Sequence, residues 1–353
     1  MEKVSRTADC DQQMTQEEKP PTAVMTAYPP APTPSSSASK RFLALLEGMR
    51  PRQWTKNFAV FIGLVFSQRL PIFSHQGLTE VVSLERAAIA FLIFCLASST
   101  IYLLNDLLDL EKDRQHPTKR NRPLASGRLP ISWAIAGMGA ILLIGGGLTG
   151  VLYSFHIQGP DIFAQFGGAT TLFISIIAAY LVLMVCYSLR LKHIVLVDVF
   201  VIAFGFVLRI MAGAVVIPVY ISPWLYVVTS FLSLFLALSK RRHELVLLQG
   251  RASNHRRILK EYSIPMLDQM ITITVAATLI SYSLYTIEGS TGDYRLIVTL
   301  PFVLYGMFRY LYLVYMKAEG GSPEEVLLRD RHMIGTVLLC TMLIMVVLYL
   351  LPQ

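Results

Sequence analysis

Long apolar runs recur along the chain from about residue 57 onward, and short polar segments separate them. Each run is close to the twenty residues that a helix needs to cross a membrane, except the first and the sixth, which are shorter. The pattern therefore predicts an all-α polytopic membrane protein with nine transmembrane helices. The predicted spans are 57–71, 87–108, 131–155, 168–189, 194–218, 223–238, 265–287, 296–316 and 333–351.

The first 40 residues differ in composition from the rest of the chain. They are rich in Pro, Ser, Thr and Gln and include PPAPTPSSSAS, which is typical of a disordered tail. They contain no apolar stretch of the kind that a secretory signal peptide carries. We therefore expect a disordered N-terminal tail at residues 1–40 and a transmembrane domain at residues 41–353.

The composition favours a membrane protein and argues against other classes. Of the 353 residues, 54% are hydrophobic and 15% are charged, which does not fit an ordinary soluble globular protein. The net charge of +8 lies mostly on loops between apolar runs, so it indicates membrane topology and no nucleic-acid partner. The cysteines lack the spacing of a zinc site and indicate no disulfide framework. They are Cys10, Cys95, Cys186 and Cys340.

Lysine and arginine are distributed unevenly between the two sets of loops. Of the 31 such residues, 23 lie on the loops of one side, whereas the opposite loops hold only Arg69, Arg86 and Arg295. By the positive-inside rule, the N-terminus is cytoplasmic and the C-terminus lies outside. We therefore expect a multi-pass protein of the cell (inner) membrane. The polar stretch after the second span then faces the cytoplasm.

The second apolar run ends in a charged stretch from Asn105 to Gly127, which reads NDLLDLEKDRQHPTKRNRPLASG. Asp106, Asp109 and Asp113 are spaced three and four apart, so they share one face if the helix continues. Clustered carboxylates repel one another unless a cation lies between them, and all-oxygen ligands suit Mg²⁺. The spacing therefore predicts a Mg²⁺ site, with Asn105 beside it.

Basic residues follow this acidic stretch in the same loop. A metal held by acidic residues, with bases next to it, can grip the oxygens of a diphosphate. The alternative is a charged, solvated loop between two membrane helices, but the order and spacing of the charges favour a site. The bases are Lys119, Arg120, Arg122 and Arg128.

A second polar group lies between the fourth and fifth spans. Lys192 and Tyr187 lie at the cytoplasmic end, and Asp198 lies about one turn into the fifth span. An ionisable residue inside the bilayer is costly and indicates a functional site. The alternative for Asp198 is a structural ion pair with Arg209, about three turns deeper.

Two further basic segments border the apolar runs. Arg52 and Lys56 precede the first span, where they either anchor the chain at the membrane interface or face a phosphate. Lys240, Arg241 and Arg242 end the sixth span. Because this basic segment covers about a full helical turn, at least one base faces inward. The alternative for this segment is an anchor of the positive-inside kind.

The sequence NDLLDLEKD followed by RPLASG resembles the first signature of the UbiA superfamily of intramembrane transferases. HPTKRNRP resembles its decaprenyl-phosphate phosphoribosyltransferase branch, and the similarity covers roughly residues 48–353. YSLRLKHIVLVD, FVLRIMAGA, LSKRRHEL and EEVLLRDR also belong to the resemblance. It implies a UbiA-like bundle of nine transmembrane helices around a lipid-open cavity, with Mg²⁺ and a diphosphate donor at the cytoplasmic end.

This resemblance implies Mg²⁺-dependent transfer of 5-phosphoribose from phosphoribosyl diphosphate to a polyprenyl (decaprenyl-type) phosphate, with release of diphosphate, for a cell-envelope pentose donor. UbiA-type prenyltransferases carry a second acidic motif after the sixth span, whereas here that place reads LSKRRHEL. A basic patch suits a donor with an additional 5-phosphate. Two alternatives stay open: a prenyltransferase that uses a prenyl diphosphate and an aromatic or lipid acceptor, and a non-enzymatic membrane transporter.

The resemblance also implies roles for individual residues. Asp106, Asp109 and Asp113, with Asn105, would bind Mg²⁺ and diphosphate, and Asp198 would complete the metal or ribose site. The four aspartates are the expected catalytic residues. Membrane lipid is an expected partner, and a homo-oligomer is compatible with the pattern. The expected substrate-binding residues are Asn105, Arg52, Lys56, Lys119, Arg120, Arg122, Tyr187, Lys192, Lys240, Arg241 and Arg242.

Overall fold

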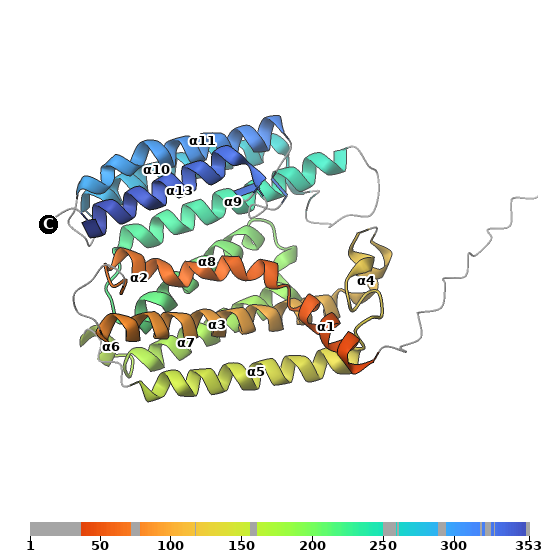
Figure 1. Cartoon of the computed structure of the whole chain (residues 1–353). Helices are drawn as coiled ribbons and strands as arrows, with labels where there is room; N and C mark the ends of the chain where they lie inside the picture. Colours follow the sequence, from red (N-terminus) through yellow and green to blue (C-terminus); the bar gives the residue numbers. More distant parts are fainter. Residues whose placement is uncertain are drawn as a thin grey trace, which may run out of the picture.

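The chain folds into a bundle of long helices in the computed structural model (Figure 1). The structure describes residues 37–71, 78–116, 118–155, 161–249, 259, 261–288, 294–317, 320–321, 326–327 and 329–350. Over these residues it contains no strand, and eight helices are long and apolar enough to cross a membrane. The predicted all-α polytopic architecture is confirmed. The predicted tail lies outside the described residues, except that its last residues open the first helix, α1.

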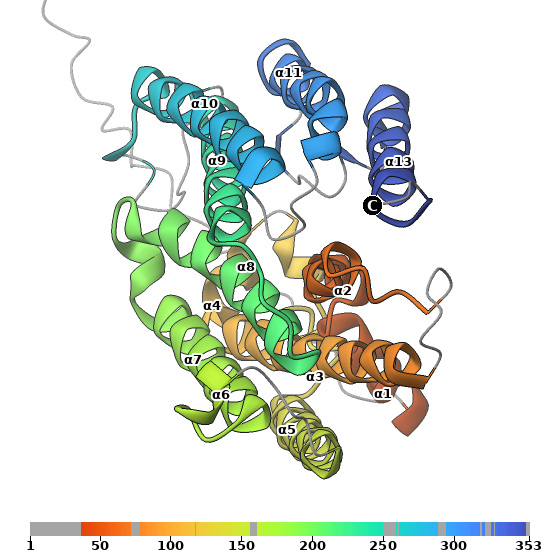
Figure 2. The same cartoon turned by 90° about the vertical axis from the view of Figure 1, so that its left-hand side faces the viewer.

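The helices form two groups that meet along α8 and α9. Figure 1 shows α9, α10, α11 and α13 in one group, and α2, α3, α5, α7 and α8 in the other. Figure 2 shows α8 between α9 on one side and α3 and α7 on the other. The helices are α1 (Ala38–Gly48), η1 (Pro51–Phe61), α2 (Ile62–Phe66), α3 (Leu78–Leu108), α4 (Leu110–Gln115), η2 (Lys119–Asn121), α5 (Ile131–Ser154), α6 (Asp161–Ala164), α7 (Ala169–Leu189), η3 (Leu191–His193), α8 (Val197–Val216), α9 (Pro223–Gln249), α10 (Ile264–Glu288), η5 (Tyr294–Thr299), α11 (Leu300–Met316), α13 (Arg331–Met345) and η6 (Val346–Leu350).

The first predicted span begins as a 3₁₀ helix and not as an α-helix. The 3₁₀ helix η1 has 11 residues and continues into the five residues of α2. A 3₁₀ helix rises about 2.0 Å per residue and an α-helix about 1.5 Å, so the two together cover about 30 Å, the thickness of the hydrocarbon core. This segment is therefore long enough to span despite its few residues. The count of nine spans stays a prediction.

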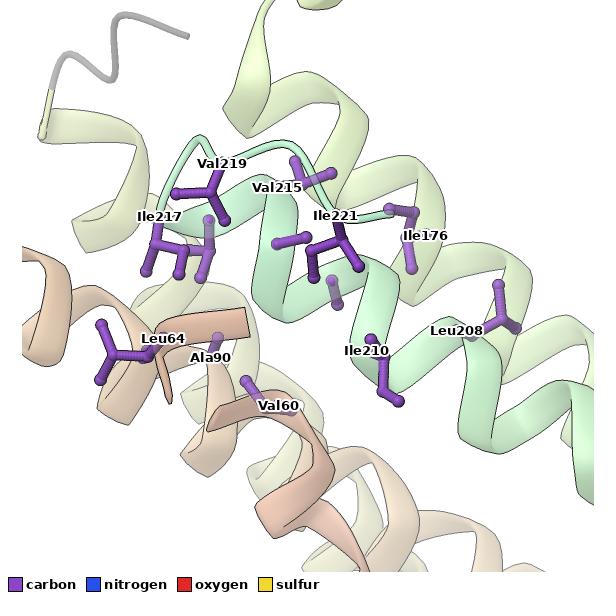
Figure 3. Packing of buried hydrophobic residues seen from close by; sticks show 14 of the residues in the cluster. Val60, Leu64, Ala90, Ile176, Leu208, Ile210, Val215, Ile217, Val219 and Ile221 are labelled. Atoms are coloured by element: carbon purple, nitrogen blue, oxygen red, sulfur yellow. The ribbon is translucent and has the colours of Figure 1, made fainter. Parts of the chain in front are cut away.

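The segment formed by η1 and α2 packs closely against α8. Val60 and Leu64 belong to the same buried apolar cluster as Ile210 of α8 and Ile217, which directly follows α8 (Figure 3). A Cβ atom at Gly213 would overlap the carbonyl of Val60, so only glycine allows this approach. Small residues at helix contacts are the usual way in which membrane helices pack backbone to backbone.

The sixth span is longer than the apolar run predicts. The run was expected to end at residue 238, whereas α9 continues to Gln249. The turns just beyond the apolar run are polar (residues 239–244), and the helix continues through them because its backbone hydrogen bonds stay formed within the helix. Lys240 and Arg242 therefore lie on α9 itself. This end of α9 lies at the same end of the bundle as α4 and the end of α3 (Figure 1).

Candidate functional site

The predicted acidic residues lie where α3 passes into α4. Asn105 and Asp106 belong to the last turn of α3, Asp109 lies between the helices, and Asp113 lies on α4. The Asp109 amide donates to the Asn105 carbonyl, and the Asp113 amide donates to the Asp109 carbonyl, so the chain stays helical across the break. Asp106 and Asp113 are buried, at 2% and 3% exposure.

Two arginines contact the buried carboxylates, one from the residue before η1 and one from the residue after η2. Arg50, at the start of η1, forms an ion pair with Asp106. Arg122, which follows η2, donates from one nitrogen, Nη1, to Asp106 Oδ1 at 3.1 Å and to Asp113 Oδ2 at 2.6 Å. Because both oxygens contact the same nitrogen, Asp106 and Asp113 converge on one point.

Lys192, from the segment between α7 and α8, contacts the other two polar residues of the same site. It lies on η3, and its side chain is only 7% exposed. Its Nζ atom lies 2.8 Å from Asp109 Oδ2 and donates to Asn105 Oδ1 at 3.2 Å. Lys192 and its two partners are more than 80 positions apart in the sequence. They meet because the C-terminal end of α3 and the short helix η3 lie at the same end of the bundle.

A second buried centre forms around Asp198. Its Oδ2 accepts a hydrogen bond from Arg241 Nε at 2.7 Å, and its Oδ1 accepts one from the Tyr262 hydroxyl at 2.8 Å. Arg241 also pairs with Glu244 at 2.6 Å. Burial and the bond to Asp198 raise the pKa of Tyr262 to about 12, so the phenol stays protonated and donates. Arg241 is therefore the base of α9 that faces inward.

The alternative of an Asp198–Arg209 ion pair is wrong. Both residues lie on α8, and the Asp198 carboxylate forms its ion pair with Arg241 instead. Arg209 instead donates at 2.8 Å to Asn57 Oδ1, to the Tyr180 hydroxyl and to its own helix at the Gly205 carbonyl. Two charges on one helix that lie eleven residues apart cannot meet.

The remaining predicted substrate-binding residues differ in burial and in the groups they contact. Tyr187 is half-buried and lies within electrostatic range of Arg241. Arg242 points elsewhere: its Nε lies 2.6 Å from Asp268 Oδ1, and its guanidinium stacks 4.0 Å over the ring of Tyr315. Arg52 and Arg120 are exposed, and Lys56, Lys119 and Lys240 are half-buried.

Sequence reasoning missed Arg50 and Tyr262. Arg50 lies next to the selected Arg52 in the chain, but only Arg50 contacts a described carboxylate of the site. Its backbone is left-handed, with φ 55° and ψ 62°, although it precedes Pro51. Such a conformation is strained in a residue other than glycine, and strain of this kind is often found at functional sites. The basic segment could have drawn attention to Arg50, whereas no local pattern marks Tyr262.

The oxygen ligands fit a metal that is shared with a phosphate group. Among the described residues, no three His, Cys, Asp or Glu side chains are close enough to hold a metal ion by themselves. Mg²⁺, however, is usually bound through one or two carboxylates together with substrate phosphates and water. Asp106 and Asp113, which converge on Arg122, can supply such carboxylates.

Comparison with known proteins gives three findings. The model of the UbiA prenyltransferase family matches residues 76–324. Decaprenyl-phosphate phosphoribosyltransferase of Corynebacterium glutamicum is 32% identical over 314 residues, which cover 88% of each chain. The protein of that name from Mycolicibacterium smegmatis is 30% identical over 323 residues, which cover 86% of this chain and 91% of the other.

Solved structures support the same fold. A UbiA homolog from Archaeoglobus fulgidus bound to GPP and Mg²⁺ superposes with a TM-score of 0.60. The superposition covers 86% of this chain and 99% of the other, at 16% sequence identity. At this identity, the likeness concerns the fold alone.

Proposed function

Because this chain belongs to the UbiA prenyltransferase family, we propose that it transfers 5-phosphoribose from phosphoribosyl diphosphate to a polyprenyl phosphate. The observation that carries this choice of donor is the buried Arg241 of α9, which pairs with Asp198 of α8. UbiA-type prenyltransferases have a second acidic motif after the sixth span, whereas this chain has bases there. Relatives named decaprenyl-phosphate phosphoribosyltransferase, similar over most of both chains, support the same choice.

The step of this reaction that most needs stabilisation by the protein is the departure of diphosphate. A polyprenyl phosphate is already an anion at neutral pH, so its oxygen needs no general base. The bond from the anomeric carbon to diphosphate must break, and negative charge then builds on the diphosphate oxygens. Arg122 and Lys192 lie beside the acidic residues and can stabilise that charge. A bound Mg²⁺ would supply further charge stabilisation at the carboxylates.

Asp198 is suited to stabilise the sugar as its bond to diphosphate breaks. Positive charge develops on the ribose ring as diphosphate leaves, and a carboxylate can stabilise it. Arg241 and Tyr262 fix the orientation of Asp198 through its two oxygens. A direct attack by the lipid phosphate would invert the configuration at the anomeric carbon. We assign positioning to Arg241 and Tyr262 and electrostatic stabilisation to Asp198.

We also propose that this site faces the cytoplasm of the cell membrane. The basic loops, which hold 23 of the 31 lysines and arginines, lie on the side of the site. Phosphorylated metabolites and Mg²⁺ are available there. Nine spans then place the N-terminus in the cytoplasm and the C-terminus outside.

The test is a transfer assay with purified protein in lipid nanodiscs. Phosphoribosyl diphosphate, a polyprenyl phosphate and Mg²⁺ should give a lipid-linked phosphoribose and free diphosphate. A parallel assay supplies a prenyl diphosphate with an aromatic acid as acceptor. Prenyl transfer without any turnover of phosphoribosyl diphosphate would favour the prenyltransferase alternative and overturn the proposal.

A further inference from the structure

In the described ion pairs of the two polar centres, the bases do not outnumber the carboxylates. Arg50 and Arg122 pair with Asp106 and Asp113, and Lys192 pairs with Asp109. In the second centre, Arg241 is shared by Asp198 and Glu244. These contacts set four bases against five carboxylates. An anionic diphosphate therefore enters a site whose described ion pairs already neutralise their bases.

Arg209 is a cation of a different kind, because its described contacts are all with neutral groups. It is 7% exposed, and its neighbours Leu208 and Ile210 lie in the buried apolar cluster (Figure 3). Its guanidinium bonds to Asn57 and Tyr180 and lies 4.8 Å from the centre of the Tyr180 ring. Among the described residues, none of its contacts is a carboxylate.

Such a charge is expensive at this depth. Arg209 is the thirteenth of the 20 residues of α8, so it lies near the middle of a membrane span. Arginine stays protonated in proteins, and a charged side chain at the depth of the bilayer centre is costly. The charge itself therefore calls for an explanation.

We propose that Arg209 supplies the positive potential that the paired site lacks and so strengthens the binding of the diphosphate group without touching it. Arg209 bonds to Asn57, which contacts Cys95 of α3. Asp106 of the diphosphate centre lies eleven positions further along α3, about 16 Å away along the helix. At an effective dielectric constant of about 20, a unit charge at that distance changes the affinity for a singly charged anion about fivefold. The effect favours anions and opposes cations.

The inference rests on the proposed function only in that the site binds a diphosphate, so the probe is inorganic pyrophosphate. Asn57→Asp places a carboxylate against Arg209 while an oxygen acceptor remains for its Nε. Arg209→Met removes the charge directly. Tyr180→Phe is the matched control, because it removes one hydrogen bond from Arg209 but leaves the charge unbalanced. Pyrophosphate binding at fixed Mg²⁺ is measured by calorimetry in nanodiscs, and Mn²⁺ binding alone by electron paramagnetic resonance.

We expect Asn57→Asp and Arg209→Met to weaken pyrophosphate binding about fivefold, while Mn²⁺ binding stays unchanged or tightens. Tyr180→Phe should remain near wild type for both ligands. Pyrophosphate binding of Asn57→Asp at the wild-type level would overturn the inference. Loss of both ligands together, or an equal loss in Tyr180→Phe, would show a structural role instead. If the wild type binds pyrophosphate but does not turn over phosphoribosyl diphosphate, only the proposed function fails.

Discussion

The ion pair between Asp198 and Arg241 should couple the stability of α8 and α9. Asp198 is fully buried, and Arg241 is 3% exposed. Removing one partner of a buried pair leaves the other charge uncompensated, which costs about 3–5 kcal/mol. Asp198→Leu also takes the acceptor from the Tyr262 hydroxyl, which adds about 1 kcal/mol. Arg241→Met should cost more than Asp198→Leu, because Arg241 keeps its pair with Glu244 when Asp198 is replaced. When Arg241 is replaced, the buried Asp198 carboxylate keeps, of its described partners, only the neutral Tyr262 hydroxyl.

The double variant Asp198→Leu/Arg241→Met should be more stable than Arg241→Met alone, because Arg241→Met by itself leaves the Asp198 carboxylate buried without a counter-charge. It removes both charges together, and apolar residues of similar volume often replace a buried pair without loss of stability. The interaction energy from the double-mutant cycle should then be about 3 kcal/mol. Turnover should nevertheless stay low, because the proposed reaction needs the carboxylate of Asp198.

The assay is unfolding by SDS in mixed micelles, followed by tryptophan fluorescence, with transfer activity measured on the same samples. Glu47→Gln is the control, because Glu47 pairs with Arg128 and the two side chains are 52% and 49% exposed. Exposed pairs contribute about 0–1 kcal/mol, so this variant should change little. Losses of the two single changes that add within about 0.5 kcal/mol would refute the coupling. Wild-type turnover of the double variant would remove Asp198 from the reaction.

Three further predictions concern the metal, the lysine and the topology. EDTA should abolish turnover, and Asp106→Ala should reduce kcat at least tenfold in a protein that remains folded; full activity in EDTA would exclude the metal. Lys192→Met should raise the donor KM about tenfold or more, because it removes a charge-assisted bond, whereas exposed Arg190→Met should not. A reporter fused after Gln353 should lie outside the cytoplasm, and a cytoplasmic position would contradict nine spans.

The sequence was sufficient for the architecture and for the first centre because both depend on local patterns. Apolar runs of about twenty residues predict membrane helices, and a three–four spacing places carboxylates on one face. The distribution of lysine and arginine assigns the segments of Lys192 and Asp109 to the same side of the membrane, although it does not indicate that the two side chains pair. The positive-inside distribution provides that placement without any knowledge of contacts.

Other features depend on contacts that no local pattern encodes. The left-handed backbone at Arg50 turns its side chain toward Asp106, and nothing in the segment around Pro51 marks that conformation. Tyr262 precedes α10 and reaches Asp198 across 64 positions. The sequence offered only Arg209, which is near Asp198 in the chain, as an alternative partner for it, whereas Arg241 is the partner in space. Long-range pairing between helices decides such cases.

The charge pairs of the site explain why metal and donor should depend on each other. Arg122 now contacts Asp106 and Asp113, and Lys192 contacts Asp109. Phosphate oxygens can replace these carboxylates as partners of the bases, but the carboxylates would then be left buried without a counter-charge, at a cost of several kcal/mol. A divalent cation at the carboxylates offsets that cost. The donor alone would leave the carboxylates without a counter-charge, and the metal alone would leave the bases without one. Each ligand should therefore bind more tightly in the presence of the other.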